Sequence, residues 1–231
     1  MTAILVAFGA GYTLDMIYVT VFYHRGLAHG AVRLRPAVRR FVLATGSWVT
    51  GIDPQAWVAM HRKHHAHADE PGDPHSPHQV GLLGVFRAQL RAYEGELLRL
   101  MVRDPAAVSW CNRRGLWWLP FVLHALLAAM LGAVTSPLAG AAWFVGVTSH
   151  PVQGWLVNAF GHAAGGRNFA TPDRSRNNWL VAAFVFGEGL QNNHHHRPSA
   201  ACFAVRWYEP DLGYLACWVL ARLGVLELRR G

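Results

Sequence analysis

Three long apolar segments dominate the pattern of hydrophobic and polar positions along this 231-residue chain. They cover residues 2–22, 116–135 and 138–157. A helix needs about 20 mostly apolar residues to cross a bilayer core of about 30 Å, so each segment predicts a membrane helix. Only Ser136 and Pro137 separate the last two segments, which predicts a tight helical hairpin. The first segment lacks a preceding basic residue and a small-residue cleavage site, so we expect it to be retained as a helix.

Shorter apolar stretches predict helices at the membrane surface. Residues 41–57 are apolar but interrupted by glycine, aspartate and proline, which predicts a helix lying on or dipping into the membrane. Residues 82–101 and 212–226 place apolar side chains at helical spacing with arginine on the opposite face, a pattern typical of interfacial helices. The sequence therefore predicts an all-α, multi-pass integral membrane protein with about three membrane helices, forming one domain over residues 1–231.

Composition and charge agree with a membrane location. Hydrophobic residues make up 52% of the chain and charged residues 15%, whereas about a quarter of the residues in a soluble domain are charged. The lysines and arginines all lie in residues 24–115 or after residue 159. The positive-inside rule therefore predicts that both polar regions are cytoplasmic. No nucleic-acid-binding motif accompanies the net charge of +8, so we expect contact with anionic lipid headgroups and no nucleic-acid partner.

Histidine is the residue type that indicates the chemistry of this chain. The chain has 14 histidines, and eight of them fall into short clusters: His24 and His29 in HRGLAH, His61, His64 and His65 in HRKHH, His162 in NAFGH, and His194 and His195 in QNNHH. Neutral imidazole binds iron, zinc, copper or nickel, and an ordinary structural zinc site takes only four ligands. A group of this size therefore predicts two metal ions.

The spacing within the clusters predicts which side chains converge. Residues three or four apart share a helix face, which groups His61 with His64 and His65, Gln191 with His194 and His195, and Asn158 with His162. His24 and His29 are five apart and cannot share the face of a straight helix. We therefore expect the helix to end or distort at Arg25 to Gly26, so that both rings reach the same place.

Four motifs together carry a resemblance to a known family. HRGLAH, HRKHH with a following DPH, NAFGH after the hydrophobic hairpin, and GEGLQNNHHH resemble in order and spacing the histidine boxes of the membrane fatty acid desaturases. The resemblance spans Tyr23 to His196 and is closest to the acyl-CoA delta-9 (stearoyl-CoA type) branch. It implies that the eight clustered histidines bind two irons in a cytoplasmic helical cap. It also implies that Asn158 lies near one iron, directly or through a water.

The chain departs from that branch in two places. Gln191 stands where the branch has the first histidine of its last box, and a carboxamide oxygen is a poorer ligand than imidazole. Gln191 or His196 could complete the metal site, and we favour Gln191 because His196 projects about 100° away from His195 on a helix. The second departure is that one apolar segment precedes HRGLAH, where the family usually has two helices.

The resemblance implies a di-iron desaturase that inserts a double bond into a saturated acyl-CoA or acyl-lipid chain. Such an enzyme uses O2 and two electrons, here from a separate ferredoxin, rubredoxin or cytochrome-type donor. Zinc could replace iron by mismetallation, because zinc binds such nitrogen donors more tightly than Fe(II). Two alternatives are a di-iron lipid or fatty acid hydroxylase on the same scaffold and a non-catalytic zinc-binding membrane protein.

Several other polar residues are candidates for supporting roles. Asp53, Asp73 and Glu188 are sequence-adjacent candidates to hold the metal-binding imidazoles in place. His75 is expected in a loop, with a supporting role as the alternative. Three further residues lie within apolar segments. We expect His124 and His150 to pack against neighbouring helices, and Asp15 to be an acid facing tyrosine or threonine, with a place near an acyl tunnel as the alternative.

Overall fold

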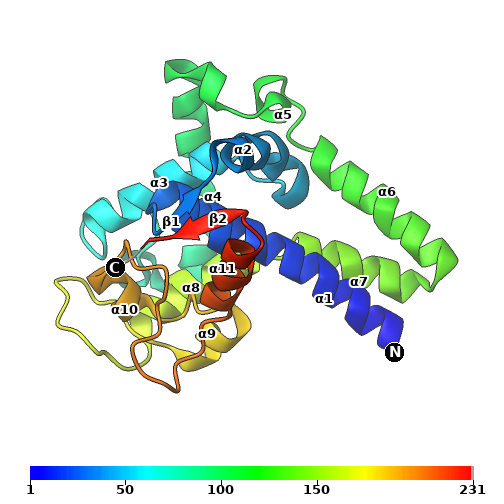
Figure 1. Ribbon diagram of the computed structural model, residues 1–231. Coiled ribbons are helices and arrows are strands. Elements are labelled where there is room, and N and C mark those ends of the chain that lie inside the picture. The colour runs from blue at the N-terminus through cyan, green and yellow to red at the C-terminus, as the bar shows by residue number, and fades with distance from the viewer. Residues whose placement is uncertain (230–231) are drawn as a thin grey trace.

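The computed structural model describes residues 1–229 and is built mainly of helices (Figure 1). In chain order the elements are α1 (Thr2–Met16), the π-helix η1 (Ile17–Ala28), β1 (Val32–Leu34), α2 (Pro36–Thr50), α3 (Pro54–His67), α4 (Pro77–Arg103), the 3₁₀ turn η2 (Pro105–Ala107), α5 (Trp110–Arg113), α6 (Leu119–Val134), α7 (Pro137–Val147), α8 (His150–Ala163), α9 (Trp179–Phe184), α10 (Gln191–His196), α11 (Leu212–Arg222) and β2 (Leu226–Leu228). The helical class is therefore confirmed.

The first apolar segment forms one continuous helix, in which α1 runs directly into η1. This helix, Thr2–Ala28, is the one in residues 1–229 that is long and apolar enough to cross a membrane. The predicted distortion is present but has a different form, because the helix widens into π turns from Ile17 instead of ending at Arg25. At its end the amide of His29 donates to the carbonyl of His24, five residues earlier, at 3.1 Å.

The predicted hairpin is confirmed. The prediction of one continuous membrane helix over residues 138–157 is wrong. α6 and α7 pair across the turn at Ser136, whose hydroxyl accepts from the amide of Ala139. The apolar run 138–157 then breaks at Thr148–Ser149, where α7 ends and α8 begins. Pro151 lies in the first turn of α8, where its missing amide hydrogen is tolerated, whereas inside a longer helix it would remove a hydrogen bond. The shorter α6 and α7 leave the multi-pass arrangement a prediction.

The region 41–57 contains two helices, because the chain turns between α2 and α3. Gly51 has a φ of +75°, a left-handed conformation that glycine adopts without strain. Asp53 then caps α3 by accepting from the amides of Gln55 and Ala56. His124 in α6 contacts carbonyl oxygens of α2 at 3.0–3.1 Å, which confirms the expected packing against a facing helix.

The core surrounds η1. Tyr18, Val21 and Phe22 are buried there with residues from α2, α11 and β2. β1 and β2 form a two-stranded antiparallel sheet with Val32 opposite Leu228, which the helical prediction missed because each strand has only three residues. α4 packs against both α3 and α8, so that the helices carrying the histidine motifs are held together.

Glycine allows α1 and α7 to lie in close contact, side by side in Figure 1. A Cβ atom on Gly146 would lie 2.5 Å from the carbonyl oxygen of Phe8, and one on Gly11 would lie 2.7 Å from that of Trp143. These neighbours are backbone atoms and cannot turn away. Because small residues allow helix backbones to approach this closely, we expect both glycines to be needed for packing.

Gly146→Ala should destabilise the protein by about 1–3 kcal/mol, the usual cost of overpacking a tight contact. Thermal unfolding of the purified protein in detergent would show this as a lower Tm. Gly9→Ala is the matched control, because a Cβ atom at Gly9 meets nothing within 4 Å. Equal Tm values for the two variants would contradict the proposed packing.

Candidate metal centre

One set of five histidines converges from three elements. It comprises His24 and His29 at the end of η1, His61 and His65 on α3, and His194 on α10. Their Nε2 atoms form a chain of short contacts. The Nε2–Nε2 distances are 2.7 Å for His29–His61, 3.1 Å for His61–His65, 3.0 Å for His65–His194 and 3.0 Å for His194–His24. We call these five residues the first histidine set.

The π turns of η1 explain how His24 and His29 both reach this set. In a π-helix the hydrogen bond joins residues five apart, so residues at that spacing lie one above the other. The two ring centroids are 5.0 Å apart. On α3, the ordinary four-residue spacing does the same for His61 and His65, whose ring centroids lie 4.6 Å apart.

The distances within the first set fit a shared metal ion. Two nitrogens bound to one metal at about 2.1 Å and at right angles lie about 3.0 Å apart. Hydrogen bonds explain the geometry poorly, because an imidazole nitrogen either donates one proton or accepts through one lone pair. Nε2 of His194 touches two other ring nitrogens and cannot form good hydrogen bonds with both.

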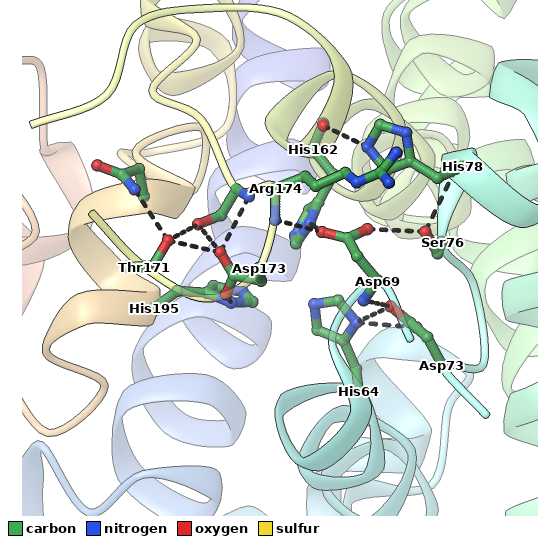
Figure 2. Close-up of polar contacts among 12 residues, drawn as sticks. His64, Asp69, Asp73, Ser76, His78, His162, Thr171, Asp173, Arg174 and His195 are labelled. Atoms are coloured by element: carbon green, nitrogen blue, oxygen red, sulfur yellow. Dashed lines mark hydrogen bonds and ion pairs between the residues drawn. The ribbon is translucent and has the colours of Figure 1, made fainter. Parts of the chain in front are cut away.

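A second set comprises His64 on α3, His162 on α8 and His195 on α10 (Figure 2). Each ring is held by an aspartate at Nδ1: His64 by Asp73 at 3.0 Å, His162 by Asp69 at 2.8 Å and His195 by Asp173 at 2.6 Å. The three Nε2 atoms are buried and have no hydrogen-bond partner among residues 1–229. We call these three residues the second histidine set.

This arrangement also fits a metal. A metal-binding histidine usually donates its other ring N–H to a carboxylate, which fixes the tautomer and aims the free nitrogen. Here the free nitrogens of His64, His162 and His195 have converging positions and lie within 4.8 Å of one another. Leaving three buried nitrogens without any partner would be costly, and a metal ion would satisfy all three.

Neighbouring residues in the sequence divide between the two sets. His64 and His65 are consecutive on α3, and His194 and His195 are consecutive on α10, yet one of each pair belongs to each set. The rings of His65 and His195 lie 4.4 Å apart across the boundary. The two sets are therefore adjacent, and α3 and α10 each contribute to both. The structure thus brings the eight predicted histidines together in two groups, and their binding of metal stays a prediction.

Burial keeps these rings in the form that binds metal. It lowers the pKa of His61 and His65 in the first set and of His64 in the second well below the usual value, and the neighbouring imidazoles lower the pKa values further. The rings are consequently neutral at neutral pH. Since a metal ion binds the unprotonated nitrogen, no proton has to be displaced from these three rings at that pH.

Glu188 links the first set to a buried ion-pair network. Its carboxylate lies 2.6 Å from Nδ1 of His24 and 2.7 Å from the guanidinium of Arg25, which also contacts Asp211 at 2.8 Å. Burial alone would raise the pKa of Glu188, but His24 and Arg25 lower that pKa to about 2. The carboxylate is thus ionised, and it orients His24 while neutralising the fully buried Arg25.

The prediction that three carboxylates hold the imidazoles in place is correct for two of them. Asp73 and Glu188 do hold imidazoles, but the prediction for Asp53 is wrong. The Asp53 side chain caps α3 and also accepts from the amide of Ser109 at 2.7 Å. The residue types were right, but closeness in sequence could not distinguish a helix cap from a histidine partner.

Sequence reasoning missed Asp69 and Asp173. Asp69 lies just after α3 with a φ of +63°, a conformation that aspartate tolerates better than most residues, and its carboxylate also accepts from Ser76. Burial would raise the pKa of Asp69, but the hydrogen bond from His162, the electrostatic effect of that ring and the hydrogen bond from Ser76 together lower it. Asp173 lies in the loop between α8 and α9, 22 residues from His195, and no spacing rule connects the two.

An apolar pocket reaches the first histidine set. His24, His61, Asn158 and Gln191 line it together with apolar side chains. Asn158 donates its amide N–H to Gln89 at 3.2 Å, and Gln191 donates to the carbonyl of Glu188 at 2.7 Å. In both side chains the amide nitrogen donates a hydrogen bond within the protein. The carboxamide oxygen is therefore the atom that could bind a metal or a water.

The remaining histidines near the site have other positions. His196 stacks on Phe169 with ring centroids 3.8 Å apart, which favours Gln191 over His196 as the residue near the metal. His75 packs against His64 with centroids 4.5 Å apart, consistent with a supporting role. Trp57 stacks on His61 with centroids 4.9 Å apart and fixes the plane of that ring.

Comparison with known proteins identifies the family. The fatty acid desaturase family model matches residues 2–213. Hex-5-enoyl-[acyl-carrier protein] acetylenase of Moorena producens is 32% identical over 93% of this chain and 73% of its own length. Delta-9 acyl-lipid desaturase 1 of Arabidopsis thaliana is 30% identical, with coverage of 93% and 71%. For sn-1 stearoyl-lipid 9-desaturase of Anabaena variabilis the identity is 29%, with coverage of 90% and 76%.

The chain therefore belongs to the fatty acid desaturase family, and delta-9 desaturases are among its relatives. The predicted resemblance is confirmed. Desaturases are oxidoreductases of lipid metabolism, and the clustered histidines agree with the metal chemistry that the family uses.

Asp173→Ala should loosen metal binding at the second histidine set, because His195 loses the carboxylate that fixes its tautomer and orientation. Loss of such a partner typically lowers metal affinity about 10–100-fold. Metal content per chain, measured after dialysis against graded chelator concentrations, should fall selectively for one of two ions. Asp104→Ala is the control, since Asp104 is exposed at the end of α4. Identical chelator curves for the two variants would contradict the assigned role of Asp173.

Proposed function

We propose that this protein is a di-iron fatty acyl desaturase that introduces a double bond into a saturated acyl chain, using O2 and two electrons. The observation that carries the proposal is an apolar pocket that opens onto the first of two adjacent histidine sets, at His24 and His61. A pocket with apolar walls suits an alkyl chain, and imidazole clusters suit iron. Membership of the desaturase family agrees with this combination.

The proposal assigns each side chain a position around two irons. One iron is held by the first histidine set: His24, His29, His61, His65 and His194. The other is held by the second histidine set: His64, His162 and His195. Asn158 and Gln191 lie on the pocket side and supply carboxamide oxygens, directly or through a water, where the second iron has fewer imidazoles. Zinc would occupy the same nitrogens in mismetallated protein.

When bound, the irons supply the oxidising power to remove hydrogen from an unactivated methylene group. The protein fixes the geometry around that chemistry. Asp69, Asp73 and Asp173 fix three imidazoles, and Glu188 fixes His24. The apolar walls of the pocket exclude water and hold the chain in a defined place, which is the positioning that sets the site of reaction.

The proposed substrate is an acyl chain on a carrier, either acyl-CoA or acyl-lipid, and the proposed bond position is near mid-chain. The named relatives act on acyl-lipids or on an acyl-carrier protein thioester, so an ester or thioester at one end is the shared feature. Electrons come from a separate ferredoxin, rubredoxin or cytochrome-type protein.

We further propose a multi-pass membrane protein with the metal site on the cytoplasmic side. The α1 part of the long helix Thr2–Ala28 and the apolar helices α6 and α7 lie to the right of the histidine-bearing helices α3 and α10 in Figure 1. The lysines and arginines all lie outside α6, α7 and the segment 2–22. Their distribution supports a cytoplasmic orientation by the positive-inside rule.

Expression in a host supplied with ferredoxin and its reductase tests the proposed function. Lipid mass spectrometry with double-bond location should detect a new unsaturated acid that disappears in His65→Ala and His194→Ala. His67→Ala is the matched control on α3, because His67 is exposed and should leave the product unchanged. A hydroxy acid in place of the alkene would show a hydroxylase. No new acid from protein that holds two irons would contradict the proposal.

A further inference from the structure

Two groups of polar side chains outside the histidine sets have no part in the proposed reaction. One is buried where α1 meets α8, and there Oδ1 of Asp15 lies 3.6 Å from Nδ1 of His150. Neither carboxylate oxygen of Asp15 has a hydrogen-bond partner in residues 1–229, so the expected tyrosine or threonine partner is not there. His150 packs against a neighbouring helix, as expected. The other group is exposed and consists of arginines around a surface hollow beside α10.

This hollow has cationic walls. Arg197 and Arg229 line it together with the segment 199–205, Asn193, Tyr214 and Leu228, and no aspartate or glutamate is among its lining residues. Both arginines are exposed, and neither guanidinium has an acidic partner within residues 1–229. We call this site the arginine hollow.

The acids nearby in the sequence are already paired or buried. Glu209 is 6% exposed and accepts from the backbone amides of residues 205 and 206. The Asp211 side chain is 3% exposed and pairs with Arg25. Glu227 lies 3.7 Å from Arg33 on the adjacent strand. The positive charge of the hollow is therefore not neutralised by these three acids.

Phe203 separates the hollow from the first histidine set. It lines the hollow and is 2% exposed, and its ring centroid lies 4.6 Å from that of His194 and 5.5 Å from that of His24. The apolar pocket reaches the first set at His24 and His61, and it shares no lining residue with the hollow. A partner bound at the hollow would therefore leave the apolar pocket free for its own ligand.

Arginine also flanks His29, another member of the first set. Arg62 is exposed and donates to two carbonyl oxygens at the end of η1, at 3.1 and 2.9 Å. The guanidinium of Arg229 lies 3.8 Å from the position that a Cβ atom would take at Gly30. In Figure 1, α3, α10 and the C-terminal end of the chain lie on the left, whereas α6 and α7 lie on the right. The arginines thus cover a face of the first set that is remote from these apolar helices.

Such a face suits a protein that delivers electrons. An electron can cross a few packed side chains, so the donor needs close approach to the metal centre but no open channel. Complementary charge steers a donor to its docking surface and fixes its orientation. Electron-transfer encounters also use small interfaces, typically below about 1,200 Å². A cationic hollow one side chain away from two metal-binding imidazoles meets these requirements.

We propose that the arginine hollow docks an acidic one-electron redox protein, and that electrons enter the metal centre past Phe203 at His194 and His24. The inference rests on the proposed function for the presence of the irons. Each encounter oxidises the partner by one electron. Two encounters and two protons from solvent balance the reaction, in which the acyl chain loses two hydrogens and one O2 is reduced to two waters.

Stopped-flow mixing of oxidised, iron-loaded protein in detergent with a reduced acidic ferredoxin, without O2, tests the inference. Absorbance reports oxidation of the ferredoxin, so the measurement does not depend on lipid product. The second-order rate constant should fall as salt is raised, because the Debye length shrinks from about 10 Å at 0.1 M to about 3 Å at 1 M.

Charge reversal locates the docking surface. Arg197→Glu and Arg229→Glu should each lower the rate constant about tenfold or more at low salt, and the difference from wild type should shrink at high salt. Arg103→Glu is the matched control, because it makes the same change of net charge at an exposed position at the end of α4. Reduced methyl viologen, a small cation, should reduce the wild type and all three variants without the loss of rate seen with ferredoxin.

The two ways of failing are distinguishable. If methyl viologen reduces the irons but ferredoxin reacts equally fast with Arg103→Glu, Arg197→Glu and Arg229→Glu, or not at all with the wild type, the docking site is overturned and the desaturase proposal stands. If iron-loaded protein accepts electrons from neither reductant, both proposals are contradicted.

Discussion

The arrangement of the protein depends on eight buried or half-buried imidazoles that need a common partner. Their Nε2 atoms face one another instead of the backbone, and three of them have no hydrogen-bond partner in residues 1–229. Such groups are expensive to bury, yet carboxylates hold several of the rings so that they cannot turn away. Two metal ions would convert this costly arrangement into a stable one, in which metal binding contributes to the stability of the fold.

The surrounding helices can be understood as supports for these rings. The π turns of η1 place His24 above His29, and the consecutive pairs on α3 and α10 place one ring in each set. α4 packs against both α3 and α8. This packing brings His162 on α8 next to His64 on α3 and His195 on α10. Glu188 and Arg25 then join η1 to the C-terminal part of the chain through Asp211. A change in any of these supports should therefore disturb the positions of the imidazoles.

The sequence predicted which histidines converge and much of the helical framework, because histidine spacing and long apolar runs are local patterns. It could not predict the pairing of His195 with Asp173 or of His162 with Asp69, since loops bring these residues together over long separations. Asp53 shows the converse error, where an acid near a histidine motif serves as a helix cap. The break before α8 was missed because apolar residues continue on both sides of the polar Thr148 and Ser149, although Pro151 marks it.

We propose that the eight histidines hold two metal ions, in unequal sets of five and three. The most direct test is an anomalous difference map at the iron edge from crystals of iron-loaded protein, with iron content measured on the same sample. We expect two peaks, one within the first histidine set and one within the second, and about two irons per chain. A single peak, or two peaks that both contact His64, would contradict it.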